Sequence, residues 1–377
     1  MVPGAALSMA WRIQVPVWAG RCGMSMSPAY CLRGDGCGAA GSGHRFRLGV
    51  QWYVLSESCP RKICSKGLDS DVPAGSEIPR TRFSHRSIDF SQRIAVMAVV
   101  NRTPDSFFDA GSTFGLDQAI AAAMQAVQDG ADWVDIGGVP FSPGPALSWQ
   151  EEAERVVPVI RAVRERSDVL ISADTFLPQV AQAAIEAGAD VINDTTGLSQ
   201  PGMAQVVADS GAHLVLTHSL AKPRTVYPRP HYADVVGEVR DYLARKVELA
   251  VQAGIGEQKL IIDPGHDLNK NTRHTLELTG NFSPIAELGY PALAAVSNKD
   301  FIGETLNLPK SERMVGSMVS ATMCIMGGAR IIRMHNIPEA VQTVHLIEAA
   351  AGWRAPAYQV HNMSGINPPA HPEHSRN

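Results

Sequence analysis

The sequence predicts a (β/α)8 barrel, a fold in which eight parallel strands alternate with eight helices and close into a cylinder. Short apolar runs alternate with segments of helical composition through much of the chain. Eight such strand–helix pairs span about 260 residues, close to the roughly 250 residues that this barrel needs. The competing fold is an open doubly wound sheet. Neither G-x-G-x-x-G nor G-x-x-x-x-G-K-[ST] follows the first strand, which argues against a nucleotide-binding sheet of that kind.

Each predicted strand is a short apolar run, as expected for strands that are buried on both faces. The strands are predicted at 94–100, 133–136, 169–173, 190–192, 213–216, 260–262, 292–296 and 329–332. The helices are predicted at 116–128, from 148, at 178–187, 203–210 and 233–253, from 271, and at 312–326 and 338–350. Ser148 and Glu151 have the spacing of a capping box, and Pro338 suits the first turn of the last helix.

The two ends of the chain differ from this regular middle. Residues 1–90 are rich in Gly, Ser, Arg and Cys without a helix or strand period, and we expect a disordered extension or a segment upstream of a later start near Met97. Residues 91–354 form the predicted barrel domain. Residues 355–377 are rich in Pro, His and Asn, which predicts a flexible tail.

The composition and charge of the chain argue against several classes of function. Of the 377 residues 45% are hydrophobic and 19% charged, as in soluble globular proteins. The net charge of -4 gives no electrostatic case for binding nucleic acid or an anionic membrane. No apolar run approaches the roughly 18 residues of a membrane span. Only Cys324 of the six cysteines lies beyond residue 64, so a disulfide framework is not expected and the protein is predicted to be cytoplasmic.

Polar residues follow most of the predicted strands, and a barrel would bring them to one mouth, where buried charges need partners or a ligand. These residues are Asn101, Asp105, Asp174, Asn193, Asp194, His218, Asp263, Lys270, Lys299, Arg333 and His335. Single members have simpler explanations. Asp174 and Asp194 precede Thr and would suit helix caps. Lys270 would be a solvated loop charge, and His213, inside a strand, a core histidine.

The set divides into two chemical types. Asp174, Asn193 and Asp263 offer carboxylate and amide oxygens, which suit a flat ligand edge with several N–H donors. The residues that suit an anion such as a diphosphate are Asn101, Lys299, Arg333 and His335. Asn101 would also suit Mg²⁺, because this ion is usually held by few protein oxygens together with substrate phosphates.

Seven motifs resemble those of dihydropteroate synthases, in the family's order, over about 93–350. They are Asn101-Arg-Thr-Pro-Asp105-Ser-Phe107, Asp135-Ile-Gly-Gly138, Ser172-Ala-Asp174-Thr175, Ile192-Asn193-Asp194, Asp263-Pro264-Gly265, Ser297-Asn-Lys299 and Arg333-Met-His335. The resemblance implies a (β/α)8 barrel, usually homodimeric. It also implies an enzyme of folate synthesis that joins p-aminobenzoate to 6-hydroxymethyl-7,8-dihydropterin diphosphate and releases diphosphate.

The resemblance also implies residue roles. Its pterin site would consist of Asp174, Asn193, Asp263 and Lys299. Asn101, Arg333 and His335 would hold the diphosphate, with Asn101 as the Mg²⁺ ligand. Diphosphate would leave the pterin methylene, and the aryl amine would attack the cationic carbon. The catalytic residues would be Asp105, which would stabilise that carbon, together with Lys299 and Arg333.

Several positions depart from the family pattern. The family reads Gly-Gly-Glu-Ser-Thr-Arg-Pro-Gly after the second strand, whereas this chain reads Gly138-Val-Pro-Phe-Ser-Pro-Gly144, so Ser142 replaces a loop arginine. Asn298 replaces a second arginine, Leu268 an aromatic residue, and Asn336 an aspartate. The pattern is similar to a divergent second copy of the enzyme found in some actinobacteria.

Three functions therefore stay open. The first is a dihydropteroate synthase with weak activity. The second is a pterin-binding paralogue without catalysis, acting as a binder or as a partner subunit, because the lost arginines lie where p-aminobenzoate would sit. The third is a pterin-dependent methyltransferase, which would share the barrel and the pterin residues but would not need a diphosphate pocket.

Overall fold

The computed structural model describes residues 81–103, 115–140, 143–227 and 229–362, all within the unit formed by 66–377. Its strands are β1 Thr81–Arg82, β2 Ser87–Ile88, β3 Ala95–Asn101, β4 Trp133–Gly137, β5 Leu170–Asp174, β6 Val191–Asp194, β7 His213–Thr217, β8 Leu260–Asp263, β9 Leu293–Ala294 and β10 Ile331–Met334. The eight predicted strands correspond to β3–β10. The seventh is shorter than expected, because only two residues of 292–296 form β9.

Strands β3 to β10 close into a barrel, which confirms the predicted fold class. They form one sheet in the order β8-β7-β6-β5-β4-β3-β10-β9, and neighbouring strands in this order pair in parallel. A parallel bridge between Ile262 and Ala292 joins β8 to the residues just before β9. The two edges of the sheet therefore meet, which excludes the open doubly wound alternative.

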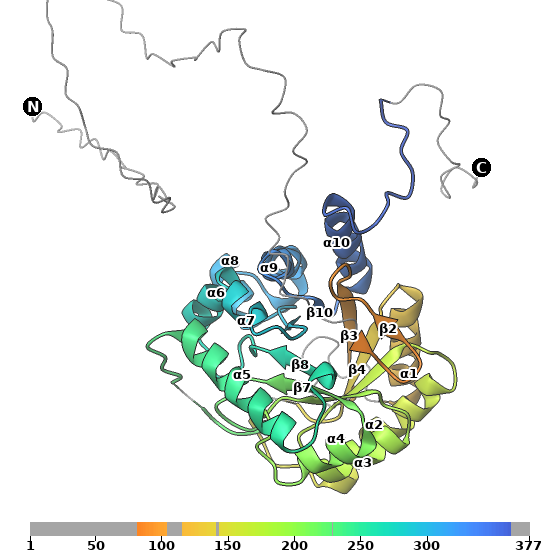
Figure 1. Ribbon diagram of the computed structural model, residues 1–377, viewed down its shortest axis with the longest axis vertical. Helices are drawn as coiled ribbons and strands as arrows, with labels where there is room; N and C mark the ends of the chain where they lie inside the picture. Colours follow the sequence, from red (N-terminus) through yellow and green to blue (C-terminus); the bar gives the residue numbers. More distant parts are fainter. Residues whose placement is uncertain (1–80, 104–114, 141–142, 228, 363–377) are drawn as a thin grey trace, which may run out of the picture. The chain divides into compact units, whose positions relative to one another are not determined.

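Helices surround the strands (Figure 1). They are α1 Leu116–Gln128, α2 Trp149–Arg164, α3 Pro178–Glu186, α4 Met203–Ser210, α5 Val235–Gln252, α6 Thr272–Gly280, α7 Ser283–Ala286, α8 Asp300–Leu306, α9 Met314–Met326 and α10 Ile337–Ala350, with short 3-10 turns η1 Glu257–Lys259 and η2 Lys310–Glu312. The predicted capping box is confirmed, since Ser148 and Glu151 bond each other's backbone N–H. The sequence analysis did not separate α7 from α6, nor detect α8. In the part of the chain that the structure describes, no helix is long and apolar enough to cross a membrane.

Alternate strand residues face two apolar layers, as the period of two requires. Between sheet and helices lie residues such as Val96, Val134 and Ile171. The neighbouring positions, one or two from each strand, face the barrel interior. They are Ala95, Met97, Trp133, Leu170, Val191, Val215, Ile261, Leu293 and Ile331. This filled interior makes the barrel a rigid support for the side chains at its strand ends.

The disordered extension was expected to reach residue 90, and for residues 81–90 this expectation was wrong. Strands β1 and β2 form an antiparallel hairpin. Phe83, Ile88 and Phe90 are buried in the same cluster as the barrel interior, and the Phe83 ring lies 4.3 Å from that of His213. Burial of such an aromatic side chain contributes about 2 kcal/mol. The sequence signal was weak because the hairpin strands have only two residues each. The structure does not describe residues 1–80 or 363–377.

Candidate functional site

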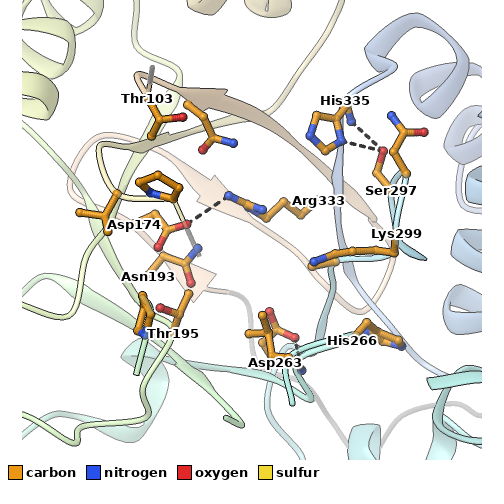
Figure 2. Close-up of a pocket in the computed structure, with 18 of the residues that line it drawn as sticks. Thr103, Asp174, Asn193, Thr195, Asp263, His266, Ser297, Lys299, Arg333 and His335 are labelled. Carbon is orange, nitrogen blue, oxygen red and sulfur yellow. Dashed lines mark hydrogen bonds and ion pairs between the residues drawn. The ribbon is translucent and has the colours of Figure 1, made fainter. Parts of the chain in front are cut away.

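A cavity of about 230 Å³ opens where the strands end. Seven of the eight predicted site residues line it, namely Asn101, Asp174, Asn193, Asp263, Lys299, Arg333 and His335. They come from the ends of β3, β5, β6, β8 and β10 and from the residue before α8. Figure 2 shows Arg333 between Asp174 and Lys299, with Asp263 below it. Asp105, the eighth residue, and Phe107 lie outside the described residues.

Arg333 connects the two chemical halves of this cavity. Its Nε lies 2.7 Å from Asp135 Oδ2 and its Nη2 lies 3.2 Å from Asp174 Oδ2. Burial opposes the charge of the guanidinium, but Asp135 and then Asp174 outweigh it and raise the pKa of Arg333. Burial, and then the nearby Asp135 carboxylate, raise the pKa of Asp174 to about 7. Asp174 is not a helix cap, because the N-cap of α3 is Leu177.

Asp135 belongs to the same hydrogen-bond network, although the sequence analysis assigned it no role. Its side chain is fully buried in β4, and it accepts hydrogen bonds from Arg333, from Ser172 Oγ and from Asn193 Nδ2 (3.2 Å). Because Asn193 donates its amide nitrogen to Asp135, its Oδ1 is turned to act as an acceptor, and no described residue donates to it. A carboxylate inside an otherwise apolar strand was the available signal, because such a group is buried only with partners.

Asp263 and the turn after it form the opposite wall. Asp263 Oδ1 accepts from Gly265 N at 2.7 Å, and Gly265 has a φ of +67°, which favours glycine. Burial raises the pKa of Asp263 to about 6, although this hydrogen bond opposes the shift. Lys270 Nζ donates to Gly265 O at 2.9 Å and to Leu268 O at 3.1 Å. These two hydrogen bonds from Lys270 fix the turn that places Leu268 in the cavity wall.

Three members of the strand-end set do not line the cavity. Asp194 accepts from Thr196 N at 2.8 Å and from Leu198 N at 2.8 Å. It therefore caps the turn after β6 and not a helix as predicted, since the N-cap of α4 is Gly202. Lys270 is buried and bonds His218 Nδ1 at 2.9 Å, so its interpretation as a solvated loop charge was wrong. Burial lowers the pKa of Lys270 to about 7 and that of His218 to about 3.

The anion-binding half lies around β10 and the residues before α8. Ser297 Oγ contacts His335 Nδ1 at 2.9 Å and accepts from His335 N at 3.1 Å, which orients the imidazole. Lys299 reaches across the cavity toward Arg333 (Figure 2). Burial lowers the pKa of Lys299, while Asp267 opposes that shift. Lys299, Arg333 and His335 line the same part of the cavity, a set of donors that suits an anion such as a diphosphate.

Mg²⁺ fits this cavity only as an ion that binds together with a phosphate-containing ligand. Among the described residues, no group of three or more His, Cys, Asp or Glu side chains could hold a metal ion. Asn101 lines the cavity together with Arg333 and His335, so its amide oxygen would be one ligand and phosphate oxygens and water the others. Few protein ligands are the usual arrangement for Mg²⁺ bound with phosphates.

The departures from the family pattern also lie in this cavity. Val139, Pro140, Leu268 and Asn298 line it, whereas Ser142 lies outside the described residues. Asn298 has a φ of +55°, and its neutral side chain brings no charge to the cavity wall. Its buried Nδ2 has no hydrogen-bond partner among the described residues. We call the part of the cavity that these loop residues line its outer end. This end is where the chain differs from the enzymes it resembles.

The fold and the site together define a class, a barrel protein that binds a flat ligand rich in N–H donors and carrying an anionic group. The family described as pterin binding enzyme matches residues 97–335. The inactive dihydropteroate synthase 2 of Mycobacterium leprae is 39% identical over 280 residues, which cover 73% of this chain and 96% of that protein. The dihydropteroate synthase of Escherichia coli is 38% identical over 255 residues, covering 67% and 90%.

A solved structure agrees with these sequences. The Yersinia pestis dihydropteroate synthase in complex with a sulfonamide drug has a TM-score of 0.70 and 36% identity, covering 73% of this chain and all of that one. The chain belongs to the dihydropteroate synthase family. The resemblance inferred from the motifs is thereby confirmed, and the relatives include both active and inactive members by name.

Proposed function

We propose that this protein binds 6-hydroxymethyl-7,8-dihydropterin diphosphate and condenses it with p-aminobenzoate, with lower turnover than relatives that keep both loop arginines. The observation that carries the proposal is the Arg333 ion pair with Asp135 and Asp174. It joins an acceptor-rich surface to a cationic one inside a single cavity. A pterin diphosphate has the matching order of groups, with N–H donors on the ring and negative charge at the other end.

Each half of the substrate has its own residues in this proposal. Asp174, Asn193 and Asp263 accept the N–H groups of the pterin, and Lys299 donates to a ring acceptor. Asn101, Arg333 and His335 hold the diphosphate. Charged donors and acceptors make hydrogen bonds about twice as strong as neutral ones, so this pairing provides both affinity and orientation.

The reaction follows from that orientation. The bond between the methylene carbon and the diphosphate oxygen breaks, and the electron pair leaves with diphosphate. The amine nitrogen then bonds to the methylene carbon and loses a proton. Arg333 and His335 stabilise the negative charge that develops on the leaving group, and Asp105 is assigned to the cationic carbon. Bound Mg²⁺ supplies further stabilisation of the diphosphate charge.

The second candidate is a pterin-binding protein without synthase activity, and two observations favour it. Val139 and Asn298 line the cavity in place of the family pattern, and the Mycobacterium leprae relative is named inactive. In this candidate the inner residues bind the pterin while the outer loops no longer position an amine. A methyltransferase is less well supported, because Lys299, Arg333 and His335 would have no anion to bind.

We also propose a cytoplasmic homodimer whose barrel domain ends near residue 354. Helix α9 supports the dimer. It carries no charged residue, and the apolar side chains on its surface that are about half exposed or more are Val315, Val319, Met323 and Met326. Such an uncharged, exposed helix face is typical of subunit contacts. Size measurement in solution tests this assignment.

Complementation of a bacterium that lacks dihydropteroate synthase separates the two candidates directly. Growth without added folate precursors supports the synthase. No growth, combined with calorimetric binding of the pterin diphosphate by purified protein, supports the binder. Absence of both growth and binding contradicts the pterin assignment itself.

A further inference from the structure

Asn269 follows Leu268 in the turn after β8 and holds the start of the connection between β7 and α5. Its Oδ1 accepts hydrogen bonds from the backbone N–H groups of Leu220 and Ala221, each at 2.9 Å. Ser219 Oγ lies 2.8 Å from the same oxygen. One side-chain oxygen therefore satisfies two consecutive backbone donors that belong to no helix or strand.

The backbone of the same residue holds the other end of this connection. Tyr232 lies just before α5, and its hydroxyl donates to Asn269 O at 3.0 Å. Asn269 has a φ of +50°, in the left-handed region that asparagine adopts more readily than most residues. Such sparsely populated conformations persist where the surroundings hold them, and they are common at functional sites.

The turn that carries Asn269 is itself held by neighbouring groups. The ammonium of Lys270 donates to two carbonyl oxygens of this turn. Asp267 Oδ2 accepts from Asp300 N, at the start of α8, at 2.7 Å. Because the turn is fixed in this way, the hydrogen bonds of Asn269 also fix the connection after β7.

The connection after β7 forms part of the cavity wall. Its buried Pro223 lines the same cavity as Leu268. The next residue, Arg224, contacts the loop after β4, since its Nε donates to Pro145 O at 3.1 Å and its carbonyl oxygen accepts from Gly144 N at 3.3 Å. Hydrogen bonds therefore join the connections after β4, β7 and β8, all of which contribute to the cavity wall.

We propose that Asn269 is a positioning residue for the second substrate, which holds Pro223 and Leu268 in place as apolar contacts for the flat ring of the aryl amine. This inference rests on the proposed function and concerns the outer end of the cavity. Asn269 is not among the residues that line the cavity, so it acts through Leu268 and the connection after β7. A preformed apolar contact binds a flat ring without the entropic cost of ordering the loops first.

Calorimetry with the full chain tests the proposal. The protein is first saturated with 6-hydroxymethylpterin and magnesium diphosphate, which cannot react with an amine, and p-aminobenzoate or its neutral analogue p-aminobenzamide is then titrated. Asn269→Gly removes the acceptor oxygen but keeps the left-handed backbone, which glycine adopts readily. It should weaken the binding of both amines about tenfold, because the connection after β7 loses its hydrogen bonds to the turn. The affinity for the pterin should not change.

Two further variants separate the role of the side chain from general damage. Asn269→Asp keeps an acceptor oxygen and should retain most of the affinity for both amines. Asn307→Gly makes the same substitution at another left-handed asparagine, the exposed C-cap of α8 with a φ of +54°. It should leave the affinity for both amines unchanged, and thermal unfolding reports the stability of each variant.

Several outcomes overturn the inference. Unchanged amine affinity in Asn269→Gly, with or without a loss of stability, would make Asn269 a purely structural residue. An equal loss of pterin affinity would mean that it supports the whole site, and a loss for p-aminobenzoate alone would assign the effect to the carboxylate and not to the ring. Wild-type protein that binds the pterin and diphosphate but neither amine would overturn the role of Asn269 and leave the pterin half of the proposed function intact. Absence of pterin and diphosphate binding would overturn both.

Discussion

The inner and outer ends of the cavity are built in different ways. The inner end consists of side chains at strand ends, where the sheet fixes the backbone and Asp135 connects Arg333 with Asn193. The outer end consists of loop residues such as Val139, Leu268 and Asn298. Loops on a rigid barrel change without disturbing the strands. A family member can therefore keep its pterin residues while its second-substrate contacts diverge.

The largest effect is expected when the inner end loses its buried centre. Asp135→Asn removes the strongest partner of the Arg333 charge, so we expect a loss of about 3 kcal/mol in the free energy of unfolding. Pterin affinity should fall at least about 100-fold, because Arg333 and Asn193 both lose their orientation. Chemical denaturation and calorimetry measure the two effects.

Asp132→Asn is the matched control for that variant. Asp132 is also buried and paired, with Arg93 Nη2 at 2.7 Å and Arg86 Nη2 at 3.1 Å, but it lies just before β4, at the opposite end of that strand. We expect a comparable loss of stability and unchanged pterin affinity in the folded protein. A similar loss of pterin affinity in both variants would contradict the special role of Asp135.

A smaller loss is expected from Asp263→Asn. The amide keeps the shape and one acceptor oxygen but removes the charge, so pterin binding should weaken about 30-fold. Asp168→Asn, at an exposed aspartate, controls for net charge. Unchanged affinity in Asp263→Asn would remove this residue from the pterin site and leave it only its bond to Gly265.

The pH dependence of pterin binding gives an effect of about tenfold. Asp174 has a pKa of about 7 in the folded protein, above its ordinary value, so the folded state binds the proton more tightly than the unfolded chain. Its contribution to stability therefore falls as pH rises from about 4 to 7. Ligand N–H groups need the ionised form, so affinity should rise about tenfold between pH 6 and pH 8.

Titration of 6-hydroxymethylpterin, which carries no phosphate, measures this dependence without interference from diphosphate ionisation. The Asp174→Asn variant should show a flatter profile. A wild-type affinity that is constant over this pH range, or that falls as pH rises, would be inconsistent with Asp174 accepting a ligand proton donor.

The smallest effect is expected at the outer end. Ser142→Arg combined with Asn298→Arg restores the family's two cations, and partly exposed ion pairs of this kind contribute up to about 1 kcal/mol each. Turnover of p-aminobenzoate should rise about fivefold with unchanged pterin affinity. Steady-state product formation measures the change. No increase would locate the divergence elsewhere in the outer loops.

The strand ends were predictable from sequence, whereas their partners were not. Apolar runs that stop at Asp174, Asn193 or Asp263 predict both a strand and a polar side chain at its end. Asp135 was harder to interpret, because its partners come from other strands and are brought together only by closure of the barrel. The short hairpin at 81–88 lacks a period long enough to detect.

Calorimetric titration of 6-hydroxymethyl-7,8-dihydropterin diphosphate into the full chain tests the central claim, that the inner end is a working pterin diphosphate site. The account predicts saturable binding that is stronger with Mg²⁺ than without it and that is lost in Asp135→Asn. Absence of heat in both conditions, from protein that is folded by thermal unfolding, would contradict it.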